Sequence, residues 1–167
     1  MPVRDPKEVF LTLLSDVRQN TERSAKFHQE LIQHAQDPDV KEILESQNLI
    51  VEQDLARLDR CFTILGEKPV KLSGRLQEIF AEDFRKEVSE IQSPVAKTLF
   101  VLSRLTQLAH LRMGEYAALT AAADLTGHYA VGSLVESSLA DKIAFAERAR
   151  RLIRNIAEER VTERRAA

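Results

Sequence analysis

LTQLAHLRMGEYAALTAAADLTGHYAVGSLVESSLADKIAF, the stretch Leu105–Phe145, decides the fold. Apolar residues recur in it every three or four positions on both sides of Gly127, which is the spacing of an amphipathic helix. Glycine readily adopts the left-handed backbone that ends a helix and turns the chain. The stretch therefore predicts two long antiparallel helices, over residues 94–126 and 128–160, that meet at Gly127.

Three helix starts can be recognised from short polar signals followed by proline. Asp5, Asp37 and Ser93 each precede a proline, and a capping side chain followed by proline at the first helical position is a typical helix start. The first two signals predict helices over residues 5–36 and 38–65. Because the link between them is so short, these two helices must be antiparallel.

The second helix is expected to end at Gly66, and Pro69 prevents its continuation. Between there and Ser93 the pattern changes to a shorter amphipathic segment, which predicts a crossover helix over residues 74–91. Two antiparallel hairpins joined by one long crossover are the arrangement of ferritin-like four-helix bundles. We therefore expect an all-α fold of this type, with residues 1–167 forming a single domain.

Composition limits the functions that are plausible. The 167 residues carry a net charge of −2 and only 5% aromatic residues without tryptophan, which does not indicate binding to nucleic acid. The N-terminus lacks the apolar run of a signal peptide, and no run approaches a membrane span. The single cysteine, Cys61, cannot form an internal disulfide and is expected to be a small core residue. These features predict a cytoplasmic protein.

The first helix becomes polar in its middle, from Arg18 to Ser24. Such a change within a core-facing seam is typical of a site inside a bundle, and also of a helix whose middle is exposed. The sequence alone leaves both interpretations open.

Three segments of the chain carry a resemblance to known proteins: FLTLLSD near the N-terminus, LARLDRCFTILGEKP at the end of the second helix, and AHLRMGEYAALTAAADLTGHYAVGSLVESSLADK across the last hairpin. They resemble the corresponding segments of a bacterial family, the YciE/YciF-type ferritin-like proteins. The similarity extends over essentially the whole chain. It implies a stress-associated protein that forms homodimers and resembles di-iron carboxylate proteins.

A di-iron or di-manganese bundle needs inward carboxylates from all four helices, with pairs spaced three residues apart on one helix face. Most family ligand positions carry other residues here. The positions that the resemblance assigns to the interior are Thr21, Leu49, Ile50, Ala109, Arg112 and Asp141. Only Asp141 keeps a carboxylate, and a cationic Arg112 would repel a metal ion.

Our first hypothesis is a bundle that has lost its metal centre, binds no cofactor and acts as a non-catalytic stress-linked or interaction protein. Arg112 would then occupy the place of the metal charge and satisfy Asp141, with Glu52 or Asp54 as further partners, unless it faces solvent. The alternative is an oxidase or peroxide-consuming enzyme with iron or manganese at a shifted site. Its candidate ligands are Glu22, Glu52, Asp54, His110, Glu115 and Asp141.

His28 and His110 are expected to be hydrogen-bonded, half-buried residues. A third interpretation is a self-associating module, because small residues permit close helix approach. The alanines that could form such a face lie on the helix predicted over residues 94–126 and are Ala117, Ala118, Ala121, Ala122 and Ala123. They could equally pack within the bundle.

Overall fold

The computed structural model describes the backbone of residues 5–166 and the side chains of residues 5–159. This part of the chain is helical and contains no strand, which confirms the all-α class. Five helices follow one another: α1 (Pro6–His34), α2 (Pro38–Leu65), α3 (Arg75–Glu90), α4 (Pro94–Leu125) and α5 (Tyr129–Ala166). The last helix, predicted over residues 128–160, continues to Ala166.

The three helix starts form as their sequence signals predict. Asp5, Asp37 and Ser93 lie outside the helices in extended conformation, and each side chain accepts a hydrogen bond from a backbone N–H of the first turn. Proline follows each cap in the first turn, where its missing N–H leaves no bond unmade. Local sequence therefore fixes where α1, α2 and α4 begin.

Glycines in left-handed conformation form two of the helix ends. Gly66 has a φ of 66° and Gly127 a φ of 75°. After Gly66, the N–H of Glu67 returns to the carbonyl of Phe62 at 3.2 Å. After Gly127, the N–H of His128 returns to the carbonyl of Ala123 at 2.8 Å, which turns the chain directly into α5.

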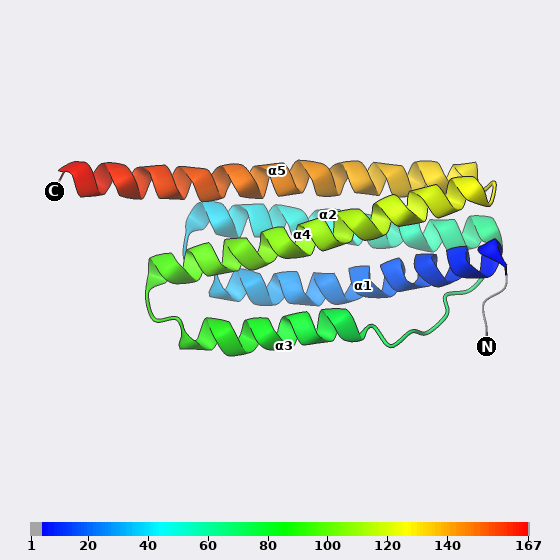
Figure 1. The fold of residues 1–167 in the computed structure, drawn as a ribbon, viewed down its shortest axis with the longest axis horizontal. Coiled ribbons are helices and arrows are strands. Elements are labelled where there is room, and N and C mark those ends of the chain that lie inside the picture. Colours follow the sequence, from blue (N-terminus) through cyan, green and yellow to red (C-terminus); the bar gives the residue numbers. More distant parts are fainter. Residues whose placement is uncertain (1–4, 167) are drawn as a thin grey trace.

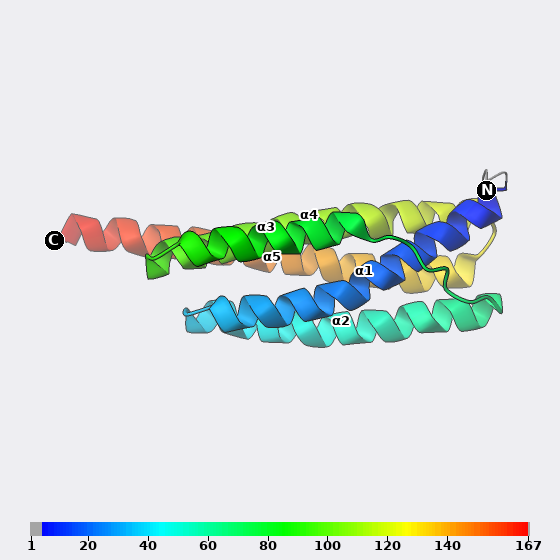
Figure 2. The ribbon, with the colours of Figure 1, turned by 90° about the horizontal axis from the view of Figure 1, so that it is seen from below.

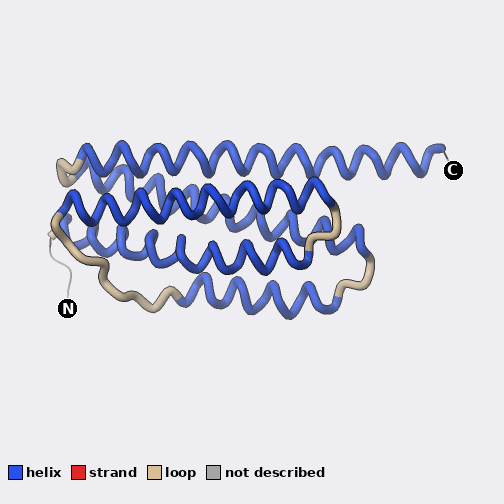
Figure 3. The backbone as a smooth tube through the Cα atoms, turned by 180° about the vertical axis from the view of Figure 1, so that it is seen from behind, coloured by secondary structure: helices blue, strands red, loops and turns tan. Residues whose placement is uncertain are grey.

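The four long helices lie side by side as two antiparallel pairs, α1 with α2 and α4 with α5 (Figures 1 and 2). The pairs contact each other through α1 on α4 and α2 on α5. The chain crosses between the pairs through an extended loop and α3, which lies on the outside against α1 and α4 (Figure 3). The C-terminal end of α5 projects beyond the other helices (Figure 1).

The core consists of two apolar clusters, one in each half of the bundle. The first surrounds Phe27, Leu105 and Phe145 and includes Phe84 of α3. The second surrounds Phe10 and Tyr116 and includes Cys61, which is buried as expected. Buried polar side chains lie in the long helices between these clusters, so the polar middle of α1 faces inward.

Within residues 5–166, none of the helices carries an apolar stretch of the length that a lipid bilayer requires.

Candidate functional site

Polar and charged side chains from all four long helices meet between the two apolar clusters. We call this set the polar layer. Its members are Asn20 and Thr21 of α1, Asp54 and Arg57 of α2, Arg112, Glu115 and Tyr116 of α4, and Ser138, Asp141 and Lys142 of α5. Six of them are nearly inaccessible to solvent: Thr21, Asp54, Arg112, Tyr116, Ser138 and Lys142.

Arg112 faces the interior and is only 3% exposed, which confirms the inward orientation. Its guanidinium forms an ion pair with Glu115 and donates to the hydroxyl of Thr21. It also donates to the carbonyl of Val17 at 3.0 Å. The partner of Arg112 is therefore Glu115, one turn along the same helix, and the predicted pair with Asp141 is wrong.

Thr21 joins Arg112 to Tyr116. The threonine hydroxyl donates its one proton to the carbonyl of Val17 at 2.7 Å. Its oxygen lies 3.0 Å from the phenolic oxygen of Tyr116, so the tyrosine must be the donor in that bond. Thr21 therefore accepts hydrogen bonds from both Arg112 and Tyr116, and these bonds hold α1 against α4.

Asp54 and Lys142 form the second charged centre, between α2 and α5. The ammonium of Lys142 pairs with one oxygen of Asp54, a side chain with no exposed surface. Arg57 reaches the other oxygen at 3.1 Å and Asp141 at 2.6 Å. The carboxylate of Asp54 therefore holds two cations, and Asp141 is paired with Arg57 at the edge of the layer.

Tyr116 lies between the two charged centres. Its ring centroid is 5.2 Å from the guanidinium carbon of Arg112 and 5.6 Å from the ammonium nitrogen of Lys142. Both cations are attracted by the electron-rich ring. Burial raises the pKa of Tyr116 to about 12, so the ring stays a neutral phenol beside them.

The charges of the polar layer balance. Three cations face three carboxylates: Arg57, Arg112 and Lys142 against Asp54, Glu115 and Asp141. Burial raises the pKa of Glu115 and lowers that of Lys142, and in each case this effect exceeds the opposing attraction of the ion-pair partner. The pairs therefore offset a large desolvation penalty and add little net stability of their own.

His28 is buried and uncharged at neutral pH. Its Nδ1 lies 2.7 Å from the carbonyl oxygen of Ser24, which can only accept, so Nδ1 carries the proton. The pKa of His28 is lowered from 6.5 to about 4. Burial is the main cause, and the nearby charges of Lys142 and Arg112 contribute, although the bond to Ser24 opposes the shift. His110, by contrast, is exposed, so the expectation that it is half-buried is wrong.

The interior positions expected from the resemblance are partly inside and partly outside. Thr21, Ala109 and Arg112 are buried, and Ile50 is half-buried. Leu49 is 62% exposed, so its assignment to the interior is wrong.

The inward side of α2 explains the error at Leu49. Gln47, Val51, Asp54 and Leu58 are its buried residues in this region, spaced three or four apart. Leu49 lies two residues from both Gln47 and Val51, about 200° around the helix axis from each. It therefore faces solvent.

The alternative set of metal ligands does not come together. Glu22 and Glu52 are exposed, and His110 is exposed with its Nδ1 2.8 Å from the carbonyl of Thr106. Asp54, Glu115 and Asp141 are occupied by cations. Among residues 5–159, no group of three or more histidine, cysteine, aspartate or glutamate side chains could hold a metal ion. These residues do not fit a di-metal centre.

The sequence did not single out Gln47 and Ser138, which are buried, or Arg57, which is half-buried at the edge of the polar layer. The spacing of Asp54 and Arg57, three apart on one helix, was a usable signal for a pair. The sequence also did not predict Lys142 as the buried partner of Asp54.

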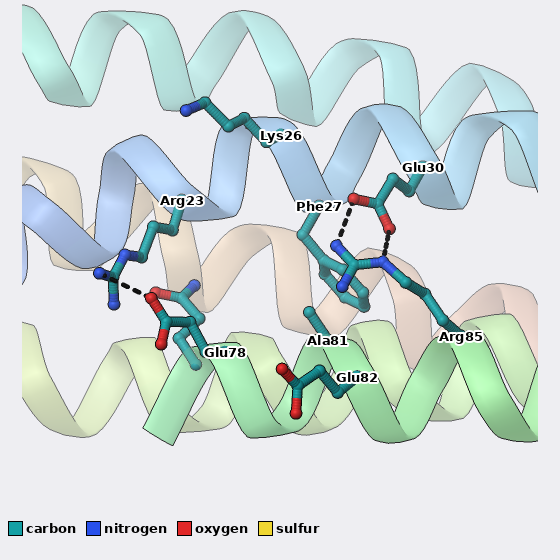
Figure 4. A pocket seen from close by; sticks show the side chains of 9 residues that line it. Arg23, Lys26, Phe27, Glu30, Glu78, Ala81, Glu82 and Arg85 are labelled. Atoms are coloured by element: carbon teal, nitrogen blue, oxygen red, sulfur yellow. Dashed lines mark hydrogen bonds and ion pairs between the residues drawn. The ribbon is translucent and has the colours of Figure 1, made fainter. Parts of the chain in front are cut away.

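A surface hollow of about 210 Å³ lies between α1 and α3 (Figure 4). Ion pairs cross it at two places, Arg23 with Glu78 at 3.0 Å and Arg85 with Glu30 at 2.7 Å. Arg85 contacts both oxygens of Glu30, the two-pronged geometry that makes such pairs strong. These two ion pairs hold α3 against α1.

The alanines of α4 divide between surface and core. Ala117, Ala118 and Ala121 are exposed, Ala122 is half-buried and Ala123 is buried. The first three do not pack within the bundle of one chain.

The chain belongs to the family described as "Domain of unknown function (DUF892)", whose model matches residues 5–162. Together with the structural likeness below, this confirms the resemblance to YciF-type proteins. No curated protein sequence matches the chain.

Solved structures show the same fold at low sequence identity. The stress protein YciF of E. coli is 16% identical, with a TM-score of 0.88 over 93% of this chain and 99% of its own. YcfI of Rhodopseudomonas palustris, provisionally described as a structural protein, is 19% identical, with a TM-score of 0.85 over 89% and 94%. A protein from Xanthomonas campestris is 18% identical, with a TM-score of 0.76 over 96% and 99%.

Replacing Arg112 with alanine should lower the free energy of unfolding by about 3 kcal/mol or more, because the part-buried Glu115 would lose its cationic partner and keep only a hydrogen bond from Asn20. Arg150→Ala is the matched control. It removes an ion pair of the same spacing, with Glu147, at the surface, and should change stability by less than about 1 kcal/mol. Urea unfolding measures both. Equal, small changes would contradict the burial of Arg112.

His28 should make stability depend on pH between 6.5 and 4. Because its folded pKa of about 4 lies below the unfolded value of 6.5, the unfolded chain binds the proton first. Stability should therefore fall as pH decreases through this window, by up to about 3 kcal/mol from His28. His28→Asn should lose this component, and His110→Asn, at an exposed histidine, should keep it. Parallel pH profiles of the wild type and His28→Asn would contradict the assignment.

Proposed function

We propose that this DUF892 protein is a single-domain, ferritin-like four-helix bundle that has lost its di-metal centre and acts without catalysis. The observation that supports the proposal is the pair of buried cations, Arg112 and Lys142, at the level where the metal ligands of such bundles lie. Both point into the interior, and their carboxylate partners are engaged.

Electrostatics opposes a metal ion at this level. A divalent ion about 5 Å from a fixed positive charge is repelled by on the order of 6 kcal/mol at an effective dielectric of about 20. Two such cations, Arg112 and Lys142, lie here. A metal would also need Asp54 and Glu115 to leave the cations that they neutralise. Both effects disfavour a metal ion at this level.

The alternative, an iron or manganese oxidase or a peroxide-consuming enzyme, has no comparable support. It would need the exposed Glu22, Glu52 and His110 to move inward and join Asp54, which pairs with Lys142. No observation in the polar layer favours such a rearrangement.

For the cellular role, we propose a stress-linked structural or interaction protein of the cytoplasm that forms homodimers. The likeness to the stress protein YciF supports the first part. The single buried thiol of Cys61 agrees with a reducing compartment. The exposed alanines at 117, 118 and 121 offer a face on which a second copy could approach closely.

Metal loading tests the loss of the metal centre. Purified protein is incubated with excess iron(II) or manganese(II) under anaerobic conditions, dialysed, and analysed by mass spectrometry for bound metal. We expect far less than one ion per chain, because Arg112 and Lys142 repel the metal. A di-iron bundle protein treated in parallel controls for loss during dialysis. Retention of one or two ions per chain would contradict the proposal.

A further inference from the structure

A small cavity lies beside the polar layer, where α1, α2, α4 and α5 meet. Its volume is about 10 Å³, which is about the space that one water molecule needs. The polar side chains that line it are Thr21, Ser24, His28, Gln47, Arg112 and Lys142. Four apolar side chains, Val51, Leu108, Ala109 and Phe145, complete the lining and supply most of its exposed surface. Water is therefore held here only where a polar atom binds it.

Gln47 brings an unpaired acceptor to this cavity. The side chain is 2% exposed, and its Oε1 is buried without a hydrogen-bond partner among the described residues. A buried carbonyl oxygen left without a donor destabilises a fold. Buried polar groups are nearly always paired with protein or with ordered water, so Gln47 requires a donor in the cavity.

His28 brings a second acceptor. Because its Nδ1 carries the proton and donates to Ser24, its Nε2 has a free lone pair in the neutral ring. Neither Gln47 Oε1 nor His28 Nε2 can satisfy the other, since both accept. A single molecule that satisfies both of them has to donate two hydrogen bonds.

Lys142 supplies the complementary donor. Its ammonium has three N–H groups and hydrogen-bonds to one protein acceptor, Asp54. A molecule in the cavity can therefore accept from Lys142 while it donates to Gln47 and His28. Two donors and an acceptor in a volume of about 10 Å³ are the properties of water.

We propose that one water molecule is bound here as a permanent part of the structure, donating to Gln47 and His28 and accepting from Lys142. It would connect α1, α2 and α5 through a single hydrogen-bonded centre. The inference rests on the proposed function, because a metal at this level would reorganise the same side chains. A cation is disfavoured by Lys142 and Arg112, and a larger ligand by the volume.

High-resolution crystallography of the full chain tests the proposal. We expect one isotropic peak within hydrogen-bonding distance of Gln47 Oε1, with no anomalous signal at the iron or manganese edges. Gln47→Met, which keeps the volume but removes the acceptor, should lose the peak. Gln53→Met is the control, since Gln53 is exposed on the same helix and its replacement should leave the peak in place.

The possible failures are distinguishable. A site without density in the wild type would show a dry cavity and overturn the water while leaving the proposed function intact. A peak with an iron or manganese anomalous signal would overturn both. If Gln47→Met does not crystallise, magnetisation transfer from water to the His28 ring in solution replaces it. We expect transfer in the wild type and its loss in Gln47→Met, and equal transfer in both would contradict the proposal.

Discussion

The ion pair between Lys142 and Asp54 is the constraint on which the rest of the interior depends. Both side chains are removed from water, so the charge of Lys142 is not tolerable without Asp54, and Asp54 without Lys142 would keep only Arg57 as a partner. Asp54 belongs to α2 and Lys142 to α5, and sliding one helix by a turn of about 5.4 Å would separate them. The pair therefore fixes the register of the two helices, even though burial offsets most of the attraction between the charges.

The same logic extends across the bundle. Arg112 is neutralised by Glu115 on its own helix, and it reaches α1 through Thr21 and the carbonyl of Val17. Tyr116 lies between the two cations and links the centres. Apolar clusters on both sides supply the free energy of folding, and the polar layer determines how the helices align. In a di-metal bundle a cation would hold the inward carboxylates together. Here we infer that protein cations do so.

Local signals were enough to predict the fold class and the helix ends that depend on single residues. Caps such as Asp37 and the turn glycine Gly66 act through bonds to their own helix, so their effect can be predicted from a few neighbouring residues. Prediction of the site residues required knowing which face of each helix points inward, and a few neighbouring residues do not determine that. The resemblance placed Leu49 inside, although the nearest buried residues of α2 lie two positions away. The pair of Lys142 with Asp54 joins two helices, so no single segment predicts it. The pair of Arg112 with Glu115 lies within α4, but the burial of Arg112 depends on its contacts with α1.

The coupling energy between Asp54 and Lys142 tests the central claim most directly. A double-mutant cycle with Asp54→Leu and Lys142→Met, followed by urea unfolding, separates the pair from the burial of each side chain. We predict that each single variant loses about 3 kcal/mol or more and that the double variant regains most of it, with a coupling of about 2 kcal/mol or more. Additive losses, with a coupling within about 0.5 kcal/mol, would contradict an interior held together by its own buried charges.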